Sequence, residues 1–327
     1  MRSYCKLTLL FSLIFIKSLY ALETDQYLAW GHEIRESSAI INRHINSEIR
    51  ELLKSINQAT PNTMTTEPLN CSFIVKKVFH RFRPILPRRI EHWIEINKDI
   101  DIYPPRTISS LAFYKMSIYG AEVWPYYLPL TRTINMNGIY IGVDKFSHFF
   151  LYGLTYYNEY LKALEGGAND NEATISAILK GVESENGIMG KYSSAVFSFA
   201  DLEANFQGFL FAKNLCEKHI GLDPLTKKFK LKNEVDMNQY ISPNWDESYY
   251  NSAYFSYRFV AVKPYLMKYC LAQKEPWVVS KRAYYLSQFT QKGFSLNYYY
   301  LKILSASGAI LNQNSYSLDR LCTNSLN

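Results

Sequence analysis

The stretch that organises this sequence runs from residue 144 to residue 164 and reads DKFSHFFLYGLTYYNEYLKAL. Together with the glycines at positions 166 and 167, it predicts one helix that ends at that pair. Asp144 and His148 are four residues apart, so on a helix both side chains lie on one face. Such a pair can orient a proton donor or supply two metal ligands. Alternatively, Asp144 caps the helix and His148 is a core histidine with its hydrogen bonds satisfied.

A second predicted helix spans residues 172–185 and ends in two acids. Ile175, Ile178 and Val182 recur at spacings of three and four, as one apolar helix face requires. Glu183 and Glu185 then fall at the C-terminal end, where the helix dipole opposes a negative charge. That placement favours a carboxyl group with a raised pKa, which glycosidases use to protonate a leaving oxygen. The alternative is a solvated helix end without a chemical role.

A third segment begins with the turn Ser193-Ser194-Ala195 and continues as a helix predicted over residues 201–219, with Asp201 as its N-cap. Asn205 and Gly208 then form an N-x-x-G pattern. A helix that ends in Glu, a Ser/Ala-rich turn and an N-x-x-G helix start together resemble the goose-type lysozyme and lytic transglycosylase superfamily, over residues 172–211. Leu202 stands where that family has proline.

This resemblance implies a glycan-cleaving site. Glu185, or Glu183 in its place, matches the general acid that protonates the glycosidic oxygen of a cell-wall polysaccharide. Asp144 and His148 would then orient that acid or a water, and Tyr192 would stack on sugar rings. The other side chains expected to contact substrate are Ser193, Asp201 and Asn205. Neither a cofactor nor a metal is expected for such a reaction.

A second resemblance leaves the function open. The D-K-x-x-H-F pattern at residues 144–149 is similar to a short signature of VanZ-like proteins and of some small envelope lipoproteins. In a non-catalytic exported protein, Asp144, His148, Glu185 and Asp201 would form a buried polar network that joins three helices. A third possibility is a zinc or manganese site built from Asp144, His148 and one acid. The exposure of Glu185 to solvent discriminates between an enzyme and a structural network, because an enzyme needs an open groove beside this acid.

The first residues predict export. Arg2 and Lys6 precede an apolar run over Leu7–Ile16, and a small-x-small site ends at Ala21. The run is shorter than the roughly 20 residues that span a membrane. We therefore expect a signal peptide over residues 1–21 and a periplasmic or secreted protein of 306 residues, since 327 − 21 = 306. The peptide holds three basic residues and no acid, so the net charge falls from +7 to +4.

Cysteine usage agrees with export. The signal peptide contains Cys5, and four cysteines remain in the mature chain: Cys71, Cys216, Cys270 and Cys322. An even number in an oxidising compartment predicts two disulfides, with three possible connectivities. Metal binding by these cysteines is not expected, because the sequence has no C-x-x-C pair.

The remaining sequence predicts a mainly helical single domain over residues 22–327, with long irregular connections and disulfide staples. Hydrophobic residues make up 48% and charged residues 20%, which excludes disordered, collagen-like and coiled-coil chains. We expect further helices over residues 41–56, 71–82, 108–118, 260–272 and 278–290, a short strand over 139–143, a polar centre over 144–208, and an excursion over 221–244. The mild positive charge suits an anionic envelope glycan rather than nucleic acid, and we expect no transmembrane segment in the mature chain.

Overall fold

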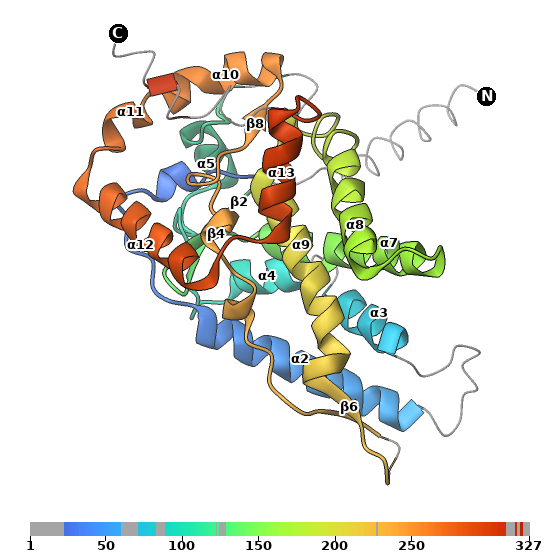
Figure 1. The fold of residues 1–327 in the computed structure, drawn as a ribbon. Coiled ribbons are helices and arrows are strands. Elements are labelled where there is room, and N and C mark those ends of the chain that lie inside the picture. Colours follow the sequence, from blue (N-terminus) through green and yellow to red (C-terminus); the bar gives the residue numbers. More distant parts are fainter. Residues whose placement is uncertain are drawn as a thin grey trace, which may run out of the picture.

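The computed structural model describes residues 23–59, 71–82, 89–121, 123, 129–226, 228–311, 318, 321 and 322. The signal peptide predicted over residues 1–21 lies outside the described residues. The fold is mainly α-helical (Figure 1), as the sequence predicts. The α-helices are α2 (Ser38–Ala59), α3 (Cys71–Phe82), α4 (Arg89–Ile96), α5 (Ser110–Met116), α6 (Lys145–Ser147), α7 (Gly153–Glu165), α8 (Asp170–Glu185), α9 (Phe199–Asn214), α10 (Ser256–Leu266), α11 (Tyr269–Ala272), α12 (Pro276–Lys292) and α13 (Leu296–Ala306).

Shorter elements connect these helices. Two π-helices, η2 (His148–Tyr152) and η3 (Leu215–His219), precede α7 and follow α9. The 3₁₀ helices are η1 (Gln26–Ala29), η4 (Met237–Gln239) and η5 (Pro243–Trp245). The strands are β1 (Glu23–Thr24), β2 (Leu130–Thr131), β3 (Thr133–Met136), β4 (Ile139–Gly142), β5 (Val196–Phe197), β6 (Ile220–Leu222), β7 (Phe229–Leu231) and β8 (Ala253–Tyr254). The β1–β2 pair is parallel, whereas β3–β4, β5–β8 and β6–β7 are antiparallel.

Helix α9 is the centre of the fold. It is apolar around most of its circumference, and a helix of that kind is stable only when other elements cover it on all sides. Helices α7 and α8 pack against each other and against α9, and in Figure 1 α2 crosses near the lower end of α9, with α3 to the right. Helix α2 contributes Ile41, Ile45 and Ile49, which are fully buried at a spacing of four residues. Helix α9 itself is in contact with α6, α7, α8, α13, η2, η3 and η5, so its first turn lies inside the molecule.

Two glycines allow α7 and α9 to touch backbone to backbone. A Cβ atom built on Gly153 would lie 2.7 Å from the Cα of Gly208, and one built on Gly208 would collide with the carbonyl oxygen of Phe149. Backbone atoms cannot move aside as a flexible side chain can. Gly208, which the sequence places in an N-x-x-G pattern, is therefore required at this crossing.

Replacing Gly208 with alanine is expected to lower the free energy of unfolding by about 1–3 kcal/mol, the usual cost of overpacking a core. The measurement is urea unfolding followed by circular dichroism. Gly166→Ala is the control, because this glycine lies at the end of α7 with a negative φ and its added Cβ would meet its nearest atom at 3.3 Å. Equal stability of the two variants would contradict the close crossing.

Several predicted elements differ in the structure. The helix expected over 144–164 is divided into α6, η2 and α7, and the helix expected to begin at Asp201 begins two residues earlier. Its N-cap is Ser198, whose hydroxyl accepts the Asp201 N–H, so the prediction that Asp201 caps the helix is wrong. A serine one turn upstream competes for the same role. Helices α4 and α13 were not predicted, and helix α3 has the predicted bounds.

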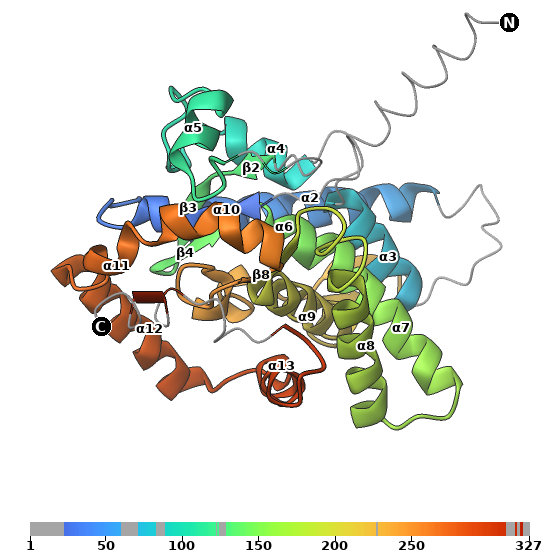
Figure 2. The ribbon, with the colours of Figure 1, turned by 90° about the horizontal axis from the view of Figure 1, so that it is seen from above.

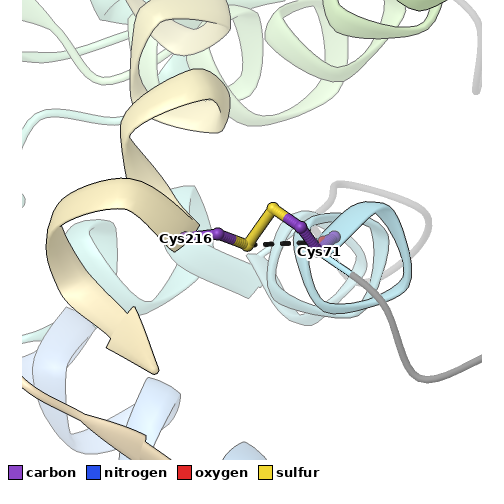
Figure 3. Close-up of a disulfide and its surroundings, with 2 residues drawn as sticks. All are labelled: Cys71 and Cys216. Atoms are coloured by element: carbon purple, nitrogen blue, oxygen red, sulfur yellow. Dashed lines mark hydrogen bonds between the residues drawn. A yellow bond between two sulfur atoms is a disulfide. The ribbon is translucent and has the colours of Figure 1, made fainter. Parts of the chain in front are cut away.

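Two disulfides link distant segments, and the number agrees with the sequence. Cys71 pairs with Cys216, and Cys270 pairs with Cys322. Figure 3 shows the first bond joining the beginning of α3 to the chain beyond α9. There the sulfur of Cys216, which carries no hydrogen in a disulfide, contacts the Cys71 carbonyl oxygen at 3.6 Å. Among the described residues, no helix combines the length and the apolar character needed to cross a bilayer.

Candidate functional site

A buried ammonium group lies at the centre of the polar cluster. Lys145 is 0% exposed. Its Nζ lies 2.7 Å from Asp144 Oδ2, 2.7 Å from Asp201 Oδ1 and 2.5 Å from Glu247 Oε1. Burial alone would lower the pKa of Lys145, but these three carboxylates raise it well above its usual value, Asp144 most strongly. The lysine is therefore a permanent positive charge inside the core.

Three chain segments supply Lys145 and the three carboxylates around it. Asp144 and Lys145 stand where β4 leads into α6, and Asp201 is in the first turn of α9. Glu247 follows η5, and its backbone N–H donates to Oε1 of Gln26, 221 residues away in sequence. Short elements with well-satisfied backbone groups thus bring these charges together from remote parts of the chain.

Asp144 accepts hydrogen bonds from two threonines as well as from Lys145. Its Oδ1 accepts the hydroxyl of Thr24 at 2.5 Å and that of Thr131 at 3.0 Å, both on paired strands β1 and β2. Burial by itself raises the pKa of Asp144, but the charge of Lys145 and these hydrogen bonds bring it below its usual value. Asp144 is therefore ionised at neutral pH.

His148 occupies the first position of the π-helix η2. Its Nε2 lies 3.3 Å from Asp201 Oδ2, and its Nδ1 lies 3.2 Å from Asn205 Oδ1. Burial and the nearby charge of Lys145 lower the pKa of His148 to about 4, so the imidazole is neutral at neutral pH. π-Helices of one turn are frequent at functional sites. Here the π-helix directs the imidazole towards α9.

Two further acids are buried beside this cluster. Glu185, at the end of α8, is 3% exposed and accepts the backbone N–H of Ser198 at 2.9 Å. Burial, and then the charge of Asp201, raise the pKa of Glu185 well above its usual value. Burial and the charge of Glu247 do the same to the pKa of Glu23 on β1. Burial therefore favours the neutral form of both acids.

The remaining two acids of the cluster titrate near neutrality. Burial raises the pKa of Asp201 to about 6 and that of Glu247 to about 7, although Lys145 lowers both. The hydroxyls of Ser198 and Ser252 also contact Glu247, at 3.2 and 3.3 Å. One ammonium and one carboxylate are thus permanently charged, and the other acids share the remaining protons.

The structure brings together five of the predicted site residues: Asp144, His148, Glu185, Asp201 and Asn205. It separates the other three. Glu183 is on the surface, in an ion pair with Lys180 at 2.7 Å. Tyr192 is 64% exposed. The hydroxyl of Ser193 donates to the carbonyl oxygen of Met189 at 2.5 Å, within its own turn.

Three residues of the cluster were not predicted: Glu23, Lys145 and Glu247. Lys145 is inside the quoted D-K-x-x-H-F pattern, and the Asp144-Lys145 pair between the apolar Val143 and Phe146 is a signal that could have identified it. Glu23 and Glu247 lie outside the polar centre expected over residues 144–208, and nothing in their local sequence marks them as buried.

The geometry of the cluster also shows whether its side chains could hold a metal ion. Asp144, His148 and Asp201 each offer a ligand atom, and these atoms all lie within 4.8 Å of one another. Imidazole and carboxylate ligands of this kind suit zinc or manganese. However, Lys145 Nζ is 2.7 Å from both aspartates and already occupies the position between them. A metal would have to displace this ammonium group, so the donor set does not fit a resident metal.

A cavity of about 380 Å³ lies elsewhere, between α9, the segment from η4 to η5, and the turn between α12 and α13. Its lining includes Glu203, Phe206 and Phe294 but not Glu185. Comparisons with protein-family models, with curated proteins and with solved structures found no significant match to this chain.

Proposed function

We propose that this chain is an exported protein of the cell envelope that acts without cleaving a glycan, and that its Asp/Lys/His/Glu cluster is a structural network. One observation carries this proposal: Lys145 is fully buried and contacts three carboxylates. The network joins β1, α6, α8, α9 and the segment after η5 around one internal cation. Such a network can select one packing of the elements that contribute to it.

The burial of Glu185 supports a structural role for this acid. A general acid must reach the oxygen that it protonates, directly or through one water. Glu185 is covered from solvent and anchors the backbone of Ser198. The raised pKa of Glu185 would suit glycan cleavage, but burial together with the neighbouring charge of Asp201 accounts for it without a catalytic role.

The disulfides support the proposed location. Cys71–Cys216 and Cys270–Cys322 account for the four cysteines that follow the predicted signal peptide. Disulfides that persist in a folded protein are typical of the periplasm and of secreted proteins.

The test is a turbidity assay of the mature protein on peptidoglycan sacculi, native and N-deacetylated, beside the Glu185→Gln variant. We expect no clearing by either protein. We also expect Glu185→Gln to be at least as stable as the parent at pH 7.5, because glutamine resembles the neutral form of the acid, which burial favours. Urea unfolding measures this stability.

Glu183→Gln is the matched control, since it removes an exposed acid two residues away on the same helix. Clearing by the parent and by Glu183→Gln, but not by a stably folded Glu185→Gln, would show a glycan-cleaving enzyme instead. Strong destabilisation by Glu185→Gln without clearing would mean that this acid is ionised in the network.

A further inference from the structure

We propose that the outer face of α10 and α11, together with the turn over residues 187–192, docks on an anionic lipid surface. This proposal does not depend on the role of the buried cluster. In Figure 1 these two helices form the upper edge of the molecule, and Figure 2, seen from above, shows α10 in front of the other helices. We call this surface the α10 face.

The α10 face is apolar where a surface helix is normally polar. Four large side chains point outward at helical spacing, with Val260 72% exposed and Leu271 74% exposed. The other two are Tyr257 and Met267. The opposite side of α10 already packs into the interior through Val262 and Leu266. The exposed apolar side chains are therefore additional to those that fold the helix.

The charge on this face is mainly positive, although the exposed Glu275 lies next to Lys274. Residues 256–274 contain four basic residues and no acid. Arg258 is buried, whereas Lys263, Lys268 and Lys274 are exposed between the apolar side chains. A helix that presents apolar side chains among lysines is typical of proteins that lie on an anionic membrane surface.

The turn after α8 extends the same surface. The hydroxyl of Tyr257 donates to the Lys191 carbonyl oxygen at 3.3 Å, and Lys191 Nζ lies 5.6 Å from the centre of the Phe255 ring. These contacts place the exposed side chains of Ile188 and Tyr192 beside the beginning of α10. The α10 face thus combines side chains from two segments that are about 70 residues apart in sequence.

Charge decides between a membrane and a second copy of this chain. In a symmetric dimer the same patch would meet itself, so the lysines of one copy would face those of the other. An anionic bilayer instead offers phosphates to the lysines and an acyl region to the apolar side chains. The α10 face therefore fits lipid better than it fits itself.

The experiment is vesicle flotation of the mature protein with phosphatidylglycerol/phosphatidylcholine vesicles and with pure phosphatidylcholine vesicles. We expect binding to the first kind, weakened by salt, and little binding to the second. The triple variant Lys263→Gln, Lys268→Gln, Lys274→Gln should bind on the order of 100-fold more weakly, since each lysine contributes about fivefold. Val260→Ser with Leu271→Ser should also weaken binding.

The matched control is Lys228→Gln, Lys230→Gln, Lys232→Gln. It removes the same charge from exposed positions at the β6–β7 hairpin, at the opposite end of the molecule in Figure 1, and should bind as the parent does. Circular dichroism checks that each variant is folded. Equal losses in both triple variants, or equal binding to both kinds of vesicle, would overturn the proposal. A parent dimer that Val260→Ser with Leu271→Ser converts to monomer would also overturn it, by assigning this face to a second copy.

Discussion

Replacing Lys145 with methionine is expected to lower the free energy of unfolding at pH 7.5 by about 3–5 kcal/mol, as when one partner of a buried ion pair is removed. Methionine fills a similar volume, so the loss arises from charge rather than from a cavity. Asp144, Asp201 and Glu247 would remain buried with no cation beside them. Their mutual repulsion and their lost hydration then have no compensation.

The loss of stability caused by Lys145→Met should become smaller as the pH falls from 7.5 to 5. Burial gives Asp201 a pKa of about 6 and Glu247 a pKa of about 7 even beside Lys145, so both take up protons in this range. Without Lys145 these pKa values would rise further. The parent itself should gain stability between pH 8 and pH 5, because its folded state binds protons that the unfolded state does not. His148 acts in the opposite direction. Its pKa is lowered to about 4 in the folded protein, so below pH 6.5 the unfolded state binds a proton that the folded state does not, which offsets part of the gain in stability.

Urea unfolding of parent and variant at pH 5 and at pH 7.5 measures both effects. Lys180→Met is the matched control and should have no measurable effect, since its ion pair with Glu183 is exposed. If Lys145→Met does not fold at pH 7.5, adding Asp201→Asn and Glu247→Gln should restore folding by removing the unpaired charges. If Lys145→Met is as stable as the parent and its free energy of unfolding does not change between pH 5 and pH 7.5, the proposal of a buried charge network is contradicted.

Local sequence chemistry determined which elements could be predicted. Helix α3 has the predicted bounds because a proline follows it closely. The helix predicted over 144–164 contains a π-helix instead, since the close crossing of Gly153 and Gly208 fixes the backbone there. A contact between residues 55 positions apart leaves no local pattern. Pro84 and Pro87, just before α4, and the three consecutive tyrosines of α13, a residue type that favours strands, obscured these two helices.

The same distinction applies to the cluster. Asp144, His148, Glu185 and Asp201 were predicted because they occur within one segment of the chain and on successive helices. Glu247 is 102 residues from Lys145 in sequence, and Thr24 is 120 residues from Asp144. Only tertiary packing brings them together. Lys145 was overlooked as a member because an isolated lysine is almost always exposed, and the exception requires carboxylates that the local sequence does not show.

The second large effect is expected at the disulfide between Cys71 and Cys216. It closes a loop of 145 residues, and the entropy of such a loop in the unfolded chain corresponds to about 5 kcal/mol. The Cys270–Cys322 bond closes 52 residues, for which the same relation gives about 4 kcal/mol. Replacing both cysteines of the first pair with serine should therefore destabilise the protein somewhat more than replacing those of the second.

The places of the two disulfides in the fold also indicate that loss of Cys71–Cys216 destabilises the protein more. Cys71 is the first residue of α3, and Cys216 is in the π-helix η3 that follows α9, so the bond attaches α3 to the end of the central helix (Figure 3). The other bond attaches Cys322 to α11, which is not in contact with the central helix in the way that η3 is. Urea midpoints of the two double-serine variants, each compared with the parent that has both disulfides, measure the contribution of each bond. The fully reduced parent, which lacks both bonds, gives their combined contribution. A Cys71→Ser, Cys216→Ser variant as stable as the parent would mean that packing between α3 and η3 already restricts this loop in the unfolded chain.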